Sequence, residues 1–437
     1  MLSSHSIGDY MRIKVRDGCD VLIGNCLNTL KTLPDESIHS CITSPPYYAL
    51  RDYGGEDEQI GLEETPEQFI EKLVDVFREV KRVLHPSGTL WLNIGDSYWG
   101  GKGASGQGTP EYQNARGNTL NKGHHQIGGP KKTRPTDRSH HEIKPKDLIG
   151  IPWMLAFALR ADGWYLRQDI IWAKPNCMPE SVKDRCTKSH EYIFLLSKSK
   201  KYFYDSEAIK EPVKQDWGTR DRTNGKYHNE GTGLQPHSGL EKSYETRNKR
   251  SVWNVSPKPY SEAHFAVFPP ELIEPCVLAG TSQGGCCSKC LAPYVRTTGR
   301  PCQQCGEIIP TQGKECKACG FRNTEWMNER EINDQKRGVI GGGHRHTARK
   351  KNMTTATVAS NQYLPSCDCE DAEQISCTVL DPFGGSGTTA GVALKHRRNA
   401  ILCELNDSYV DLMAGRIKAI TGLHDGQKTL FTLFQDW

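Results

Sequence analysis

The sequence predicts an α/β fold, and three observations support this class. Short apolar runs of strand length recur along the 437 residues, and segments with the apolar periodicity of helices lie between several of them. With 36% hydrophobic residues, a chain of this length can form one large core and an accessory module. Strands that alternate with crossover helices build a mixed, mostly parallel sheet with helices on both faces, so we expect that architecture.

The first part of the chain predicts a strand, helix, strand pattern. Strands are expected at 21–23 and 38–43, with a short helical piece between them. The next helix begins at Thr65-Pro66-Glu67-Gln68, which has the form of a capping box with proline at the first helical position. Apolar residues then recur every three or four positions, and a further strand is predicted at 89–94.

The later elements are separated by two long polar segments. Residues 95–144 and 205–261 have almost no periodic apolar residues, which predicts irregular loops. The elements predicted outside these loops are helices at 145–161, 271–279, 386–396 and 407–420, and strands at 165–173, 191–197, 377–381 and 399–405.

The composition and charge favour a cytoplasmic protein that contacts phosphates. Mean hydropathy is −0.63, residues 1–20 are too polar for a signal peptide, and no apolar run has membrane-spanning length. We therefore expect no membrane partner. The net charge of +4 is modest, but basic runs at 131–134, 247–250 and 345–351 lie in polar segments. Several such runs suit contacts with nucleic-acid phosphates.

One short motif combines groups that suit a planar amine. Thr43-Ser44-Pro45-Pro46-Tyr47 lies where the predicted strand 38–43 ends. The two prolines make the turn stiff, so Tyr47 projects from a rigid edge. Its ring can stack on a planar group, while Ser44 Oγ and the Pro45 carbonyl can accept hydrogen bonds from an amino function. Taken alone, such a motif is more often an ordinary turn.

A second motif has the form of a ligand-binding turn. Asp381-Pro382-Phe383-Gly384-Gly385-Ser386-Gly387-Thr388 connects a predicted strand to a helix, so its glycines allow close backbone approach and the helix start offers N–H groups. The spacing differs from G-x-G-x-x-G, and no G-K-[ST] follows, which argues against a dinucleotide or a nucleoside triphosphate. Glu404 ends the next strand, where a carboxylate can accept hydrogen bonds from ribose hydroxyls.

Together the two motifs resemble those of the DNA amino-methyltransferases of the β arrangement, in which the catalytic motif precedes the S-adenosylmethionine motif. Residues 162–172 and 190–198 resemble that family's central catalytic strands, and 264–269 resembles the segment that closes over the methionine end of the cofactor. The resemblance implies a circularly permuted, Rossmann-like fold of S-adenosylmethionine-dependent methyltransferases. It also implies methyl transfer to the exocyclic amine of a base flipped out of double-stranded DNA.

The resemblance also implies roles for individual residues. Ser44, Pro45, Pro46 and Tyr47 are the expected catalytic residues. Serine at the first position is more typical of cytosine-N4 enzymes, so N4 of cytosine is favoured and N6 of adenine stays an alternative. Asn25 stands where relatives often carry an aspartate beside the cofactor adenine. The expected cofactor-binding residues are Asn25, Thr43, Phe265, Ala266, Asp381, Pro382, Phe383, Gly384, Gly385, Ser386, Gly387, Thr388 and Glu404.

The cysteines predict structural metal sites. Nine of the seventeen lie between 286 and 369, and in a cytoplasmic chain such clustering favours metal over disulfides. The spacing of Cys302, Cys305, Cys316 and Cys319 is that of a closed, four-thiolate zinc site. A second set consists of Cys287, Cys290, Cys367 and Cys369, and its two halves flank this module in the sequence. This set predicts another zinc site, for which Cys286 is an alternative ligand.

Outside that cluster, Cys19, Cys26 and Cys41 are expected to pack in the core. We therefore predict one or two structural zinc ions in a small zinc-ribbon-like module. The predicted segments are 1–96 (catalytic half), 97–144 (polar loop that contacts DNA), 145–205 (strands and helix of the catalytic half), 206–262 (target recognition), 263–283 (cofactor-closing segment), 284–370 (zinc-binding insertion) and 371–437 (S-adenosylmethionine-binding half).

The expected partner is double-stranded DNA, and a cognate restriction endonuclease is the candidate protein partner. We expect a monomer or homodimer, prokaryotic or phage-encoded and associated with the nucleoid. A protein or RNA amino-methyltransferase and a non-catalytic zinc protein that binds nucleic acid are the alternatives. The early position of the Ser44 motif and the basic insertions favour a DNA methyltransferase.

Overall fold

The computed structural model of the chain describes two compact units. One unit contains residues up to 281 and from 377 onward, and the other spans 282–376, so the cysteine-rich segment is a unit of its own. The described residues are 3–7, 10–50, 59–100, 135–137, 139–213, 246–258, 267–301, 305, 308–310, 319–320 and 358–422.

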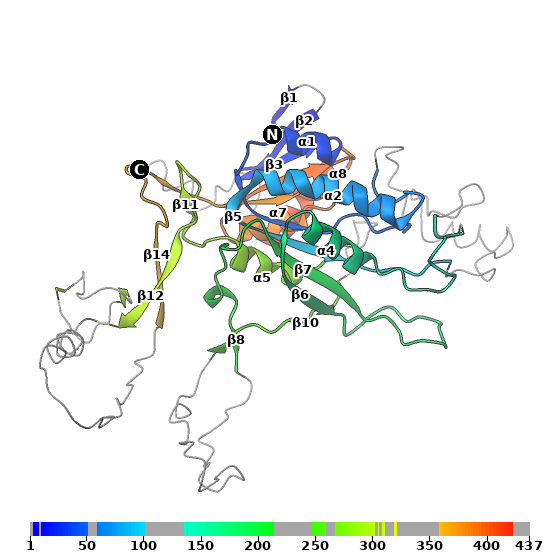
Figure 1. Cartoon of the computed structure of the whole chain (residues 1–437). Coiled ribbons are helices and arrows are strands. Elements are labelled where there is room, and N and C mark those ends of the chain that lie inside the picture. Colours follow the sequence, from blue (N-terminus) through cyan, green and yellow to red (C-terminus); the bar gives the residue numbers. More distant parts are fainter. Residues whose placement is uncertain are drawn as a thin grey trace, which may run out of the picture. The chain divides into compact units, whose positions relative to one another are not determined.

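A mixed sheet forms the centre of the first unit, with ten strands among the described residues (Figure 1). Neighbouring strands from β3 to β5 are parallel, and antiparallel pairs extend the sheet at both sides. This confirms the predicted mixed, mostly parallel sheet. In spatial order the strands are β1 (Ser3–Ile7), β2 (Tyr10–Arg16), β3 (Cys19–Ile23), β17 (Asn399–Glu404), β16 (Thr378–Asp381), β4 (Ile38–Thr43), β5 (Leu84–Ile94), β7 (His190–Ser197), β6 (Tyr165–Ala173) and β10 (Val252–Asn254).

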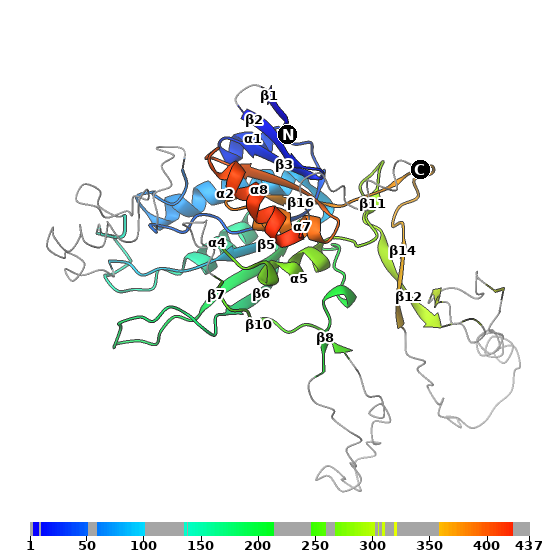
Figure 2. The same ribbon diagram turned by 180° about the vertical axis from the view of Figure 1, so that it is seen from behind.

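Helices cover both faces of this sheet, as Figures 1 and 2 show from opposite sides. Three helices bury apolar residues such as Phe77 and Leu155 in one core cluster, and three others bury residues such as Val277 and Met413 in a second. The helices of the first face are α1 (Cys26–Lys31), α2 (Pro66–Val83) and α4 (Ile151–Ala161), and those of the second are α5 (Pro270–Gly280), α7 (Thr388–Lys395) and α8 (Tyr409–Thr421).

The start of α2 follows from its local sequence. Thr65 Oγ accepts a hydrogen bond from the Gln68 amide at 3.3 Å, and Pro66 occupies the first turn, where no N–H is needed. The start of β5 differs from the prediction, because the strand begins at Leu84 rather than at 89. Pro86 is tolerated there because the pairing with β4 changes register between Ile38 and Ser40.

The prediction missed the strands β1, β2 and β10. β10 lies in the segment 205–261 that was expected to be irregular, yet Val252–Asn254 pairs in parallel with β6 and buries Trp253. Three residues are too few for a periodic pattern, so this strand depends on its neighbour. β2 does alternate apolar and polar residues from Met11 to Arg16, and it pairs antiparallel with β1.

The second unit contains two small sheets among its described residues. β11 (Cys286–Cys287) pairs with β15 (Gln374–Ile375), and β12 (Val295–Pro301) pairs with both β13 (Ile308–Pro310) and β14 (Val358–Leu364). No helix within the described ranges has both the length and the apolar character that a membrane span requires. The remaining short elements, all in the first unit, are η3 (Pro135–Asp137), η4 (Glu207–Ile209), β8 (Glu211–Pro212) and β9 (Thr246–Arg247).

Candidate functional site

The two predicted motifs lie side by side in the sheet although they are far apart in sequence. β4 ends at Thr43 and β16 ends at Asp381, and the two strands are parallel neighbours, with Leu380 opposite Cys41. Because the carboxyl ends of parallel strands open at the same edge, the two turns that follow them meet there. Ligands of α/β sheets bind at this edge.

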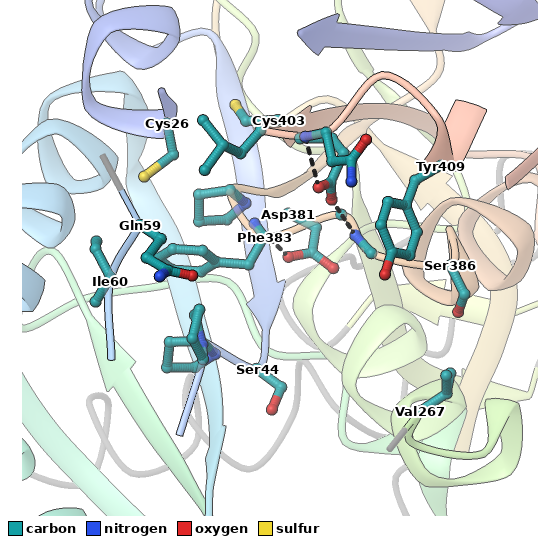
Figure 3. Close-up of a pocket in the computed structure, with 18 of the residues that line it drawn as sticks. Cys26, Ser44, Gln59, Ile60, Val267, Asp381, Phe383, Ser386, Cys403 and Tyr409 are labelled. Carbon is teal, nitrogen blue, oxygen red and sulfur yellow. Dashed lines mark hydrogen bonds between the residues drawn. The ribbon is translucent and has the colours of Figure 1, made fainter. Parts of the chain in front are cut away.

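A cavity of about 550 Å³ lies between the two turns (Figure 3). Its volume falls in the range of small-molecule sites, about 300–1,000 Å³. Most of the predicted site residues line it, from both motifs and from the ends of β3 and β17. They are Asn25, Ser44, Pro45, Pro46, Tyr47, Asp381, Pro382, Phe383, Gly384, Gly385, Ser386, Thr388 and Glu404.

Four predicted residues are not among those that line the cavity. Thr43 is 1% exposed and contacts Asp381 instead. Gly387 is the N-cap of α7 and adopts a φ of 78°, which favours glycine. Phe265 and Ala266 lie outside the described residues, whereas the cavity is lined by the two residues that follow them, 267 and 268.

Asp381 joins the two motifs through its carboxylate. Thr43 Oγ1 donates to Oδ1 at 2.6 Å, Thr389 Oγ1 donates to Oδ2 at 2.7 Å, and the Phe383 amide donates to Oδ1 at 3.1 Å. Burial raises the pKa of Asp381 to about 7, and the three hydrogen bonds oppose that shift. The side chain thus connects the end of β4 to the start of α7.

Glu404 holds the glycine turn against the next strand. The Gly385 amide donates to Glu404 Oε2 at 2.8 Å, and the Asn406 amide donates to Oε1 at 3.1 Å. Burial raises the pKa of Glu404, which the backbone hydrogen bonds oppose. Gly384 packs so closely that an added Cβ would lie 3.0 Å from Leu402 Cβ. The close approach of the turn therefore requires glycine at position 384.

Asn25 combines a structural contact with a place at the cavity. Its Oδ1 accepts a hydrogen bond from the Leu27 amide at 3.0 Å, so Asn25 caps α1. Asparagine is as good a cap as aspartate, which accounts for this residue type without a negative charge. The next residue, Cys26, packs against the first core cluster as predicted and also lines the cavity, whereas Cys19 and Cys41 are fully buried in the core.

Sequence reasoning also missed other lining residues. Gln59 and Ile60 lie on the same side of the cavity as Cys26, and Tyr409 lies on the opposite side (Figure 3). Asn406 and Tyr409 follow Glu404 closely in the sequence. Because Glu404 was predicted at the end of a strand beside the ligand, both residues could have been predicted from that position. No sequence motif identifies residues 59 and 60 as lining residues, because their place at the cavity depends on the tertiary fold rather than on their local sequence.

The Ser44 turn also places a closely packed tyrosine, Tyr47, at the cavity. The prolines 45 and 46 follow β4 directly, and Gly95 follows β5, the next strand. A Cβ at Gly95 would lie 2.6 Å from Tyr47 Cε2, so the ring fits only because residue 95 is glycine. The Tyr47 hydroxyl donates to Glu191 Oε2 at 2.7 Å. Ser44 faces the cavity with its hydroxyl (Figure 3).

Comparison with known proteins identifies the family. The model of the DNA methylases of the N6/N4 type matches residues 38–288 and 371–415. The chain belongs to this DNA methylase family. The Type II methyltransferase M.Cfr9I of Citrobacter freundii is 46% identical over 291 residues, which cover 66% of this chain and 81% of that protein. M.SmaI of Serratia marcescens is 45% identical over 288 residues, covering 65% and 83%.

Membership confirms the expected DNA amino-methyltransferase with S-adenosylmethionine as its cofactor. Among solved structures, a PvuII DNA methyltransferase described as cytosine-N4-specific matches with a TM-score of 0.45 and 14% identity, covering 94% of this chain and 88% of that structure.

A candidate metal centre lies in the second unit. The sulfur atoms of Cys287, Cys290, Cys367 and Cys369 all lie within 4.8 Å of one another. Pairing of β11 with β15 and of β12 with β14 brings the two halves of the set together. None of the described cysteines forms a disulfide. Of the other predicted set, Cys302 and Cys316 lie outside the described residues.

The chemistry of this cysteine cluster fits a divalent metal. The backbone amide of Cys290 lowers the pKa of Cys287 to about 6, and the Lys289 amide also donates to this sulfur, at 3.4 Å. The sulfur atoms of Cys290 and Cys287 raise the pKa of Cys369 to about 12. Four thiols this close cannot all ionise by themselves, and a bound cation would remove that conflict.

Proposed function

We propose that this DNA methylase transfers a methyl group to N4 of a cytosine flipped out of double-stranded DNA. One observation carries the proposal: the Ser44 turn and the glycine turn at 384–387 border the same cavity. A site for an amine and a site for a methyl donor are therefore adjacent. Serine at position 44 favours cytosine, and N6 of adenine is the alternative target.

The Ser44 motif supplies the groups for gripping the base. Ser44 Oγ and the Pro45 carbonyl would accept hydrogen bonds from the exocyclic amine, while the Tyr47 ring stacks on the base. Acceptors that pull on the amine protons leave the nitrogen lone pair available for attack. Since Pro45 and Pro46 fix the turn, these acceptors are already in place before the base enters.

The cavity also fits S-adenosylmethionine, which supplies an activated methyl group when bound. Each Glu404 oxygen accepts one backbone N–H and has a second lone pair for a ribose hydroxyl. Ile60 and Phe383 offer apolar surface for the adenine ring, and the Asn25 amide borders the same space. Phe265 and Ala266 are proposed to cover the methionine end, next to the lining residue Val267.

We propose two structural zinc sites in the second unit. One would use the Cys287 set, whose sulfur atoms already lie together, and the other would use Cys302, Cys305, Cys316 and Cys319. Four thiolates leave no open coordination position, so neither ion would act in catalysis.

DNA contact is proposed for the polar segments 97–144 and 206–262, most of which lie outside the described residues. In the described part, Arg247 and Arg250 both pair with Glu211, at 2.8 and 3.2 Å. To contact a DNA phosphate, these two arginines would first have to break their ion pairs with Glu211. We therefore assign phosphate contact first to the basic runs at 131–134 and 345–351. We also propose that the protein acts with a cognate restriction endonuclease and associates with the nucleoid. Its proposed oligomeric state is a monomer or a homodimer.

Mass spectrometry of nucleosides tests the proposed reaction. Unmethylated bacterial DNA is incubated with the protein and S-adenosylmethionine, digested to nucleosides and analysed, with a cofactor-free incubation as the control. N4-methylcytosine is the expected product. N6-methyladenine would keep the site and reject the cytosine assignment, and the absence of both would reject the proposed reaction on DNA.

A further inference from the structure

We propose that Glu191 is a positioning residue that holds the Tyr47 ring in the orientation needed for stacking on the target base. The inference rests on the proposed function, because it concerns the same base-binding site. Glu191 lies in β7, and no motif of the sequence analysis assigned it a role.

The Tyr47 side chain is restrained at two points. Its hydroxyl donates to Glu191 Oε2 at 2.7 Å, which fixes the far end of the ring. Near its middle, the ring lies against Gly95, where an added Cβ would come within 2.6 Å of Cε2. A ring held at its tip and along one edge has little freedom to rotate away from the cavity.

Glu191 is itself held by two neighbouring side chains. The Lys174 ammonium pairs with Glu191 Oε1, and the Asn93 amide donates to Oε2 at 3.5 Å and to the Tyr192 carbonyl at 3.0 Å. Lys174 also lies over the Trp172 ring, 4.1 Å from its centre. Both partners of the ion pair are mostly buried, with side chains 20% and 15% exposed.

These contacts come from three strands that share one edge of the sheet. Asn93 is near the end of β5, Lys174 directly follows β6, and Glu191 is near the start of β7. The pairing of β6 with β7 depends on the backbone, which matches Trp172 with Glu191. The backbone pairing therefore does not need the Glu191 side chain, which links Lys174 and Asn93 to the Tyr47 hydroxyl.

The charge arrangement suits a site for a neutral base. A lone carboxylate near the cavity would compete with the Ser44 and Pro45 oxygens for the protons of the target amine. The Lys174 ammonium offsets this charge, so Glu191 can accept from Tyr47 without adding a net charge. Glu191 thus acts through Tyr47 rather than on the base.

A double-mutant cycle tests this role. Methyl-transfer rates at saturating DNA and cofactor are measured for the wild type, Glu191→Ala, Tyr47→Phe and the double variant, using unmethylated bacterial DNA. Glu191→Ala should lower the rate about tenfold, as expected when an ordered side chain must be immobilised in each turnover. In the Tyr47→Phe background, which lacks the hydroxyl, the same change should cost less than about twofold.

Two further variants keep the test decisive. Glu191→Gln keeps an acceptor for the Tyr47 hydroxyl and should recover part of the methyl-transfer rate. If Glu191→Ala folds poorly, the same comparison can be made with Glu191→Gln. Asp184→Asn removes an exposed carboxylate that pairs with Lys146 on the same β6–β7 connection, and should behave as the wild type. Calorimetric titration with S-adenosylmethionine should give the same affinity for all variants.

The outcomes separate the inference from the proposed function. Equal losses from Glu191→Ala with and without the Tyr47 hydroxyl would overturn the positioning role, as would full activity of Glu191→Ala. If the wild type itself methylates no DNA base, the proposed function is wrong. A wild type that methylates DNA and shows coupling between the two residues supports both.

Discussion

The cavity of the first unit and the cysteine cluster of the second are assembled in different ways. The cavity lies at the edge of a sheet whose two faces are covered by apolar cores, so its residues are placed by packing and strand register. Among the described residues of 282–376, the buried apolar side chains are those of Cys286, Cys287 and Pro293. In its described part, the second unit therefore has buried thiols where the first unit has a hydrophobic core.

The difference shows how each unit depends on what it binds. The first unit holds its two motifs together by buried contacts within the protein, such as the hydrogen bonds of Asp381. The second unit has short strand pairs and a cluster of four thiols, and small units of this kind commonly need metal to fold. Loss of a ligand should thus unfold the second unit and leave the first intact.

Metal removal should have the largest effect. Structural zinc contributes on the order of 10 kcal/mol to folding in small zinc domains. A strong chelator should expose 282–376 to proteolysis while the first unit resists, as followed by mass spectrometry of the fragments. Cys287→Ser should lose one zinc per chain by elemental analysis, and Cys186→Ser, an exposed cysteine outside the cluster, should not. Protein purified without zinc would contradict the account.

Asp381→Ala should strongly destabilise the first unit. It leaves the Thr43 hydroxyl without its acceptor and the Thr389 hydroxyl with only the Ile42 carbonyl, at 3.3 Å, so we expect the free energy of unfolding to fall by about 2–4 kcal/mol. Denaturant unfolding followed by tryptophan fluorescence measures the change. Asp381→Asn keeps an acceptor and a similar shape, and should lose less. An unchanged midpoint for Asp381→Ala would show that the two motifs are not joined through this side chain.

The same residue should make stability depend on pH. The folded protein holds the Asp381 proton up to about pH 7, whereas the unfolded chain releases it near the ordinary value of 3.8. The folded state therefore binds more protons in this window, so the contribution of Asp381 to stability falls as pH rises from about 4 to 7. The difference in unfolding free energy between Asp381→Asn and the wild type should therefore shift in favour of the variant as pH rises through that window. A difference that is constant with pH would contradict the raised pKa.

Gly95→Ala should have a smaller effect that is confined to catalysis. The added methyl group would lie 2.6 Å from Tyr47 Cε2, so the ring must move, and we expect methyl transfer to slow about tenfold with unchanged cofactor affinity. The control is Gly95→Ala in a Tyr47→Ala background, where the clash is absent and no further loss is expected. A loss of equal size in both backgrounds would place the effect of Gly95 elsewhere.

Much of the fold was predictable because its signals are local. The capping box at Thr65 and the apolar periodicity of α2 each depend on neighbours within a few positions. β10 was missed because three residues carry no periodic pattern, and Trp253 is buried by pairing with β6 and by packing in the second core cluster. The start of β5 was predicted at 89 instead of Leu84 because a proline such as Pro86 is unusual inside a strand, and here a change of register accommodates it.

In the candidate site, too, the features within short sequence motifs were predictable and the contacts between distant strands were not. Ser44, Tyr47 and the glycine turn were predictable because each belongs to a compact motif next to a strand end. The pairing of Thr43 with Asp381 was not, because 338 residues separate them and sheet order decides the contact. Glu191 was missed for a related reason: its role depends on β5, β6 and β7 meeting at one edge. Contacts between distant strands are properties of the fold rather than of any short segment.

The most direct test of the account is the methyl-transfer rate of Ser44→Ala on unmethylated DNA, with the enzyme saturated with S-adenosylmethionine. The account predicts a loss of about a hundredfold or more, comparable to removing one preorganised hydrogen-bond partner of a reacting group. Cofactor affinity should stay within about twofold, because Ser44 would contact the amine rather than the cofactor. A Ser44→Ala enzyme with the full rate would show that the base is gripped elsewhere.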